Sequence, residues 1–78
     1  MRIETIISKN IRNLMKEKGM SARQIARQTG MCSNKSIYYY TCAHGIPNLL
    51  NALKLAKALD TTVKEIANGW EDATAFDD

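Results

Sequence analysis

Apolar residues recur every three or four positions near the start of the chain, which is the spacing of one face of an α-helix. Basic residues fill the other faces. The pattern predicts a helix from about residue 4 to Lys18, where basic side chains suit the negative end of the helix dipole. Gly19 can then close the helix in the left-handed conformation. The apolar stripe consists of Ile3, Ile6, Ile7, Ile11, Leu14 and Met15.

A second helix is shorter and begins at Ser21. The Ser21 hydroxyl can accept from an early backbone N–H while Gln24, three residues on, reaches back, which is the pattern of a capping box. Ile25 is expected to face inward, and Gly30 supplies the next stop. The sequence therefore predicts a helix over residues 22 to 29.

The stretch IYYYT, residues 37 to 41, favours a β-strand by intrinsic propensity. A lone strand cannot satisfy its own backbone groups, and the rest of the chain offers no second strand to pair with it. We therefore predict a third helix from Ser33, its N-cap, to Cys42. At helical spacing Ile37 and Tyr40 share the inward face, and Tyr38 and Tyr39 lie on the opposite side.

Two further helices complete the chain. Pro47 and Asn48 mark the start of the fourth helix, which ends near Asp60. The segment TVKE, residues 62 to 65, is another capping box and opens a last short helix, which Asn68-Gly69 breaks. The fourth helix is expected to bury a stripe formed by Leu49, Ala52, Leu53, Leu55, Ala56 and Leu59.

Five helices without a strand predict an all-α fold with a single core, in keeping with a length of 78 residues. We place the domain at residues 1–67 and treat residues 68–78 as an acidic tail. This tail holds Trp70 and Phe76. It is expected either to be disordered or to dock, on its own domain or across a dimer partner.

Charge is distributed unevenly along the chain. Residues 1–70 contain all 11 Lys and Arg together with four acidic residues. The last eight residues contain the other four acidic residues and no basic residue. The basic body favours a polyanionic partner. The start of the chain does not resemble a secretory signal and no apolar run approaches membrane-spanning length, so we expect a cytoplasmic protein.

Candidate chemistry is sparse. Cys32 and Cys42 are too few for a disulfide framework and are expected to be buried or half-buried free thiols. With His44 they give three ligands where a closed zinc site needs four, so we predict neither a metal nor a cofactor. The sequence shows no converging acid, base and nucleophile around His44, and we predict that the protein is not an enzyme.

The second and third helices, joined by a tight glycine-containing turn, have the layout of a helix-turn-helix, whose second helix lies in the DNA major groove. The stretches IRNLMKEKGMSARQIARQTG, SNKSIYYYT and IPNLLNALKLAKALDTTVKEI resemble the Cro- and phage-repressor-type (XRE-like) helix-turn-helix family over about residues 10 to 67. The resemblance implies a compact five-helix, lambda-repressor-like domain that binds DNA. The family's usual loop glycine after the third helix falls at Ala43, and Gly45 follows two residues later.

The resemblance also implies which residues meet DNA. Base edges would be read by Asn34 and Lys35 in the first turn of the third helix and by Tyr39 one turn on. Asn can pair bidentately with adenine, Lys can donate to guanine, and Tyr can donate its hydroxyl or touch a thymine methyl. The expected contacts to the DNA backbone are Ser21, Arg23, Arg27, Ser33, Ser36, Tyr38, His44 and Asn48.

The function implied is a sequence-specific transcriptional regulator, in particular a repressor that occupies a double-stranded DNA operator as a homodimer. No small-molecule ligand is evident. The alternative is a protein-interaction module, or an antitoxin-like partner-binding protein, that keeps the helix-turn-helix fold. Exposed tyrosines on the third helix would suit such a protein interface.

Overall fold

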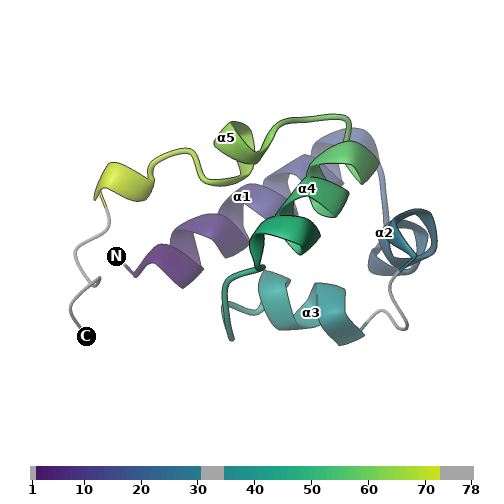
Figure 1. Ribbon diagram of the computed structural model, residues 1–78, viewed down its shortest axis with the longest axis horizontal. Coiled ribbons are helices and arrows are strands. Elements are labelled where there is room, and N and C mark those ends of the chain that lie inside the picture. The colour runs from purple at the N-terminus through teal and green to yellow at the C-terminus, as the bar shows by residue number, and fades with distance from the viewer. Residues whose placement is uncertain (1, 31–34, 73–78) are drawn as a thin grey trace.

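The computed structural model describes residues 2–30 and 35–72, and within these ranges every regular element is helical, as the sequence predicts (Figure 1). None of the helices described is long and apolar enough to span a membrane. The elements are α1 (Ile3–Lys18), α2 (Ala22–Thr29), α3 (Lys35–Thr41), α4 (Leu49–Ala58), α5 (Val63–Ile66) and the 3₁₀ turn η1 (Trp70–Asp72).

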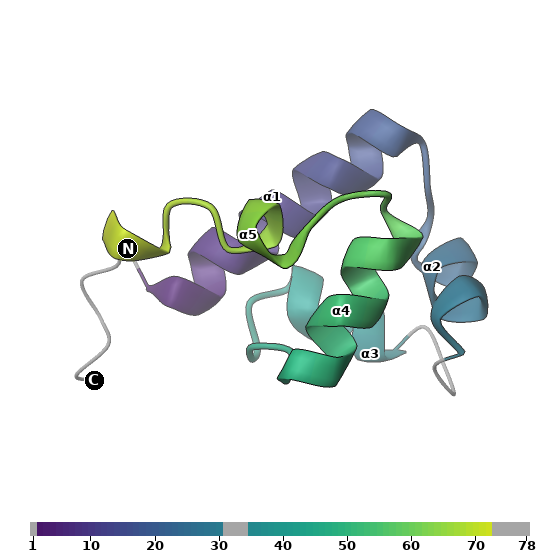
Figure 2. The same ribbon diagram turned by 45° about the horizontal axis from the view of Figure 1, so that its top comes forward.

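The helices enclose a single core, with α1 along the length of the molecule. α1 packs against α3, α5 and η1, while α4 packs against α2 and α5, and α2 packs against α3. Figure 2 shows the chain leaving α4 and returning through α5 to α1. This return closes the core on the side away from α3, so that α2 and α3 remain at one side of the molecule (Figure 1).

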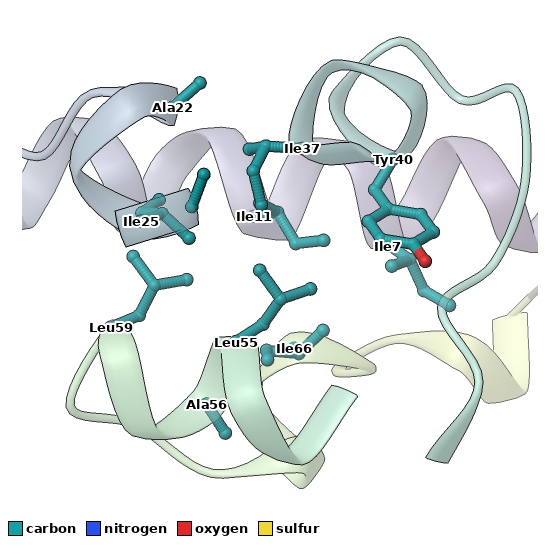
Figure 3. Packing of buried hydrophobic residues seen from close by; sticks show 11 residues of the cluster. Ile7, Ile11, Ala22, Ile25, Ile37, Tyr40, Leu55, Ala56, Leu59 and Ile66 are labelled. Atoms are coloured by element: carbon teal, nitrogen blue, oxygen red, sulfur yellow. The ribbon is translucent and has the colours of Figure 1, made fainter. Parts of the chain in front are cut away.

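Each helix contributes at least one fully buried branched side chain to the core, and Figure 3 shows how these side chains converge. Burying a side chain of this size stabilises the fold by about 1.5–3 kcal/mol relative to leaving it exposed. The inward faces predicted for α1, α2 and α3 are confirmed by this set. The large apolar side chains with at most 2% exposure are Ile11, Ile25, Ile37, Leu55, Leu59 and Ile66.

The ends of the first two helices follow the sequence closely. Gly19 (φ 66°) ends α1, with its N–H bonded to Lys16 O and that of Met20 to Met15 O, the two bonds of a Schellman motif. The Ser21 hydroxyl accepts from Gln24 N at 3.2 Å. Ser21 N in turn donates to Gln24 Oε1 at 2.8 Å, which confirms the capping box at the start of α2.

The later helices are also capped at their N-termini. Asn48 caps α4 by accepting from Asn51 N at 2.8 Å, as the predicted start requires. The Thr62 hydroxyl caps α5 by accepting from Glu65 N at 3.2 Å. In α5 the cap consists of this bond, without the reciprocal contact of a full capping box.

Two polar side chains on α1 fix its neighbours in place. The buried Ser8 hydroxyl donates to the backbone oxygen of Thr41 at the end of α3. Asn10 Nδ2 donates to the backbone oxygens of Ile66 and Asn68, at 2.8 Å each, and thereby satisfies carbonyls at the end of α5. The described start of the predicted tail, through η1, thus lies against α1.

Three predictions about burial are wrong. Leu49 and Leu53 are 71% and 52% exposed, because α4 turns only the face of Ala52, Leu55 and its helical neighbours toward the core. The Cys42 thiol is exposed because it follows α3 on the outward side. Cys32 and Phe76 lie outside the described residues.

Candidate nucleic-acid interface

Helices α2 and α3 form the two members of the predicted helix-turn-helix. They contact each other directly, and both Ile25 of α2 and Ile37 of α3 are fully buried between the helices of the core. Residues 31–34, which join them and include the predicted contacts Ser33 and Asn34, lie outside the described residues. The pairing of α2 and α3 therefore rests on their shared core contacts.

Helix α3 separates its aromatic residues between two faces. Ile37 is completely buried and Tyr40 is 8% exposed, whereas Tyr38 and Tyr39 are 54% and 51% exposed. Lys35 and Ser36 belong to the first turn of α3, and the structure describes their backbone but not their side chains. Of the three predicted base-reading residues, Tyr39 is thus the one whose side chain has a described position.

Tyr40 is fixed at both ends of its side chain. Its ring lies in the core beside Ile7 (Figure 3). Its hydroxyl accepts from Asn51 Nδ2 of α4 at 2.9 Å. The backbone N–H of Asn51 also donates to the capping side chain of Asn48. The first turn of α4 is therefore capped and bonded to α3 through the same residue. This role of Asn51 was not predicted from the sequence, because the N-cap three residues earlier indicates the backbone bond of Asn51 and not a side-chain partner on α3.

The Tyr39 ring lies over the loop that follows α3. Its centroid is 5.8 Å from that of Tyr40, edge to face, and 5.9 Å from that of His44. A Cβ at Gly45 would lie 2.3 Å from Tyr39 Cε1, so glycine at this position makes room for the ring in its present orientation. Tyr39 and His44, predicted separately as a base-reading and a backbone contact, form one aromatic surface with Gly45 beneath it.

Helix α3 ends in a Schellman motif whose left-handed residue is not glycine. His44 N donates to Tyr39 O at 3.1 Å and Ala43 N to Tyr40 O at 3.3 Å, and Ala43 adopts φ 61°. An L-residue with a Cβ adopts this conformation at a cost of about 1–2 kcal/mol. Ala43 therefore occupies the place where the sequence resemblance would put a glycine, while Gly45 is needed for the contact with Tyr39.

Basic and polar side chains are exposed on α2, the partner helix of α3. Arg23 and Arg27 are exposed on the outer face of α2, as predicted. Within the described ranges, the ion pair found is between Arg2 and Glu4, so neither α2 arginine is neutralised by a described acid. Ser21 is exposed at the N-terminus of the same helix, where the dipole favours an anion.

The predicted contacts after α3 are exposed as well. Both His44 and Asn48 are exposed, one in the loop and the other at the start of α4. The Asn48 side-chain oxygen accepts the cap bond, and the amide NH₂ of this exposed residue is the group that could donate to a phosphate oxygen. A hollow of about 430 Å³ lies elsewhere, between the ends of α2 and α4, and is lined by Gln28, Thr29, Lys54, Lys57 and Ala58.

Comparison with known proteins agrees with this arrangement. The sequence model of a helix-turn-helix family matches residues 11–66, from the middle of α1 to the last residue of α5. The match therefore covers all five α-helices at least in part. No curated protein and no solved structure matches the chain significantly.

Proposed function

Because the chain belongs to the Cro/C1-type (XRE-like) helix-turn-helix family of DNA-binding regulators, we propose that it is a sequence-specific repressor. It acts in the cytoplasm by occupying a double-stranded DNA operator as a homodimer, through residues 1–67. The observation that carries this proposal is the division of α3, in which Ile37 and Tyr40 hold the helix on the core while Tyr38 and Tyr39 face outward. A reading helix needs such an outward face for the major groove.

Base reading is assigned to the outward side of α3. Tyr39 donates its hydroxyl to a base edge or packs against a thymine methyl. Asn34 and Lys35, at the start of the helix, read adenine and guanine respectively. Support for Tyr39 comes from its half-exposed ring, which packs against the His44 ring at a centroid distance of 5.9 Å in the space that Gly45 leaves open.

Contacts to the DNA backbone are assigned to the residues around α3. Arg23 and Arg27 contribute positive charge from α2, and the N-terminus of that helix at Ser21 receives a phosphate. Tyr38, His44 and Asn48 contact the strand on the other side of the groove. Ser33 and Ser36 complete the set at the start of the reading helix. These contacts orient α3 and supply affinity that does not depend on sequence.

Repression follows from occupancy. A dimer with two-fold symmetry reads two half-sites related by the same axis, with centres about 34–36 Å or a multiple of that distance apart. The bound dimer blocks any promoter that overlaps its operator. Two modules double the contacts that one small domain makes with its own half-site.

The test is selection from a random duplex library with the full chain at about 50 and 200 mM salt. We expect enrichment of a short inverted repeat, with recovery that falls steeply at the higher salt because phosphate contacts release counterions. Transcription in vitro from a promoter overlapping the selected site should then fall as protein is added. Recovery without a motif, or transcription that rises instead, contradicts sequence-specific repression.

A second candidate is favoured by the uncharged outward surface after Lys35. A protein-interaction module, including an antitoxin-like one, would use the exposed Tyr38 and Tyr39 as interface residues. Such a module predicts no DNA recovery at either salt concentration. The same selection experiment therefore distinguishes the two functions.

A further inference from the structure

An exposed apolar surface begins in the loop after α3 and continues along α4. Its members are Ile46, Leu49, Leu50 and Leu53, which are 48%, 71%, 61% and 52% exposed. We call these four side chains the α4 patch. They are all of the exposed large aliphatic side chains that the structure describes, and they fall within the short stretch 46–53.

The α4 patch borders the core-facing side of α4 and extends the apolar surface of that helix into solvent. Leu49, Leu50 and Leu53 lie beside the buried positions 52, 55, 56 and 59 on the helix, and Ile46 precedes them in the loop. Helix α4 therefore has an apolar sector wider than the core covers, and the outer part of that sector faces solvent. An apolar surface that extends this far beyond the buried stripe indicates a second partner for α4.

Nucleic acid is not favoured as that partner, because the four side chains of the α4 patch carry neither a charge nor a hydrogen-bond donor for a phosphate. From residue 36 to residue 53 the sequence contains no Lys, Arg, Asp or Glu, in a chain that is 24% charged. A phosphate backbone would find no cation on this surface. A second copy of the chain would meet no like charge there, even though each copy carries a net charge of +3.

The area of the α4 patch fits the centre of a dimer interface. Four large aliphatic side chains at this exposure offer a few hundred Å² of apolar surface. A standard interface buries about 800 Å² per partner, somewhat more than half of it apolar. The α4 patch supplies most of the apolar share.

We propose that the α4 patch is the surface through which two copies of this chain form a two-fold symmetric dimer. The inference rests on the proposed function, because it names the interface of the homodimer that would read the operator. A two-fold interface is made by the same surface on both copies, and an uncharged apolar stripe is self-complementary. The patch also follows α3 directly in the chain, so the axis passes beside both reading helices and leaves them free for DNA.

Two variants test the interface without endangering the fold. Leu50→Asp places an acid in the first turn of α4, where the helix dipole favours it. Leu53→Lys introduces a good helix former at an exposed position. Asn13→Asp and Asn13→Lys, at an exposed site on α1, are matched controls because they change the net charge by the same amounts. Circular dichroism verifies that all four variants keep the helical content of the wild type.

Sedimentation equilibrium of the full chains without DNA measures self-association directly. We expect a reversible wild-type dimer, unchanged dissociation constants for both Asn13 variants, and an increase of at least tenfold for Leu50→Asp and for Leu53→Lys. A dimer of unaltered strength in both patch variants overturns the proposed interface and leaves the homodimer standing. A wild type that stays monomeric both free and on DNA overturns the interface and the homodimer together.

Binding to DNA separates the interface from the reading function. On a duplex with one half-site, Leu53→Lys should bind as tightly as wild type or more tightly, because it adds a cation and removes no reading residue. On the full inverted repeat it should lose cooperativity. Cooperative full-site binding by Leu53→Lys contradicts the interface. If the wild type selects no motif while the patch variants still break the dimer, the interface stands and the proposed repressor function falls.

Discussion

The inner and outer faces of α3 carry the same residue type with opposite surroundings. Tyr39 and Tyr40 are neighbours in the chain, yet Tyr39 is 51% exposed and Tyr40 is 8% exposed. Tyr40 packs with Ile7 in the core and bonds to Asn51, whereas Tyr39 lies over Gly45 and His44 at the surface. Their helical positions, about 100° apart, decide this difference, and residue type does not. Stability and the proposed recognition can therefore be tested separately on one short helix.

The largest effect is expected at the inner face. Tyr40→Ala removes a buried ring and leaves a cavity, which costs about 3–5 kcal/mol of unfolding free energy by analogy with other aromatic truncations. For a domain of this size that is a large part of the total stability. Urea denaturation followed by circular dichroism measures the loss. Tyr38→Ala, at a 54% exposed site on the same helix, is the control and should stay within about 0.5 kcal/mol of wild type.

The outer face should respond in the opposite way. Tyr39→Ala should lower discrimination between the selected operator and single-base variants by about 1–3 kcal/mol at the base it reads. The unfolding free energy should fall by at most about 1.5 kcal/mol, the value of an aromatic contact. Titration of operator and variant duplexes measures the first quantity, and Tyr39→Phe separates the hydroxyl from the ring. Unchanged discrimination by Tyr39→Ala would remove Tyr39 from the reading surface.

Most of the fold was predictable because local signals and periodicity agree. Gly19, the Ser21–Gln24 box and the Asn48 cap set helix ends that the structure confirms. Residues 37 to 41 favour a strand by local propensity, but they were correctly predicted to be helical because the sequence offers no second strand to pair with them. Ile37 and Tyr40 were correctly assigned to the core from spacing alone.

The surface was less predictable, because apolar spacing does not say which face a helix buries. Leu49 and Leu53 belong to a continuous apolar pattern on α4, and only the packing of that helix on α2 and α5 shows that they remain exposed. Gly45 posed a similar difficulty. Its need for glycine comes from the Tyr39 ring and not from a left-handed turn, and no local sequence pattern carries that information.

Gly45 offers a way to disturb the outer face from outside α3. In Gly45→Ala the new Cβ would collide with the Tyr39 ring, which must rotate away because it is the mobile end of a half-exposed side chain. We expect a loss of about 1 kcal/mol in stability, the value of the aromatic contact that is broken, and weaker operator discrimination.

A double-mutant cycle isolates the cause of the Gly45→Ala effect. In the Tyr39→Ala background the ring is gone, so Gly45→Ala should change neither stability nor discrimination further. Urea denaturation and operator titration of the two single variants and the double variant provide the cycle. Additive losses would mean that the alanine acts on the loop backbone and not on Tyr39.

The smallest effect is expected where α3 ends, and it has a counterpart at the end of α1. Both helices end in Schellman motifs, but the left-handed residue is Gly19 (φ 66°) in α1 and Ala43 (φ 61°) in α3. Ala43→Gly relieves the strain of the left-handed conformation, but it also raises the backbone entropy of the unfolded chain, which opposes folding. The unfolding free energy should therefore rise by a net amount of about 0.5–1 kcal/mol. Gly19→Ala is the reverse change at a site with no atoms near the new Cβ, and should lose a similar amount. Urea denaturation of both variants compares the two ends directly. If Ala43→Gly fails to stabilise the protein while Gly19→Ala destabilises it, the Ala43 methyl must contribute packing in the loop after α3. In that case Ala43, and not Gly45, would be the residue that keeps the loop under Tyr39 in place.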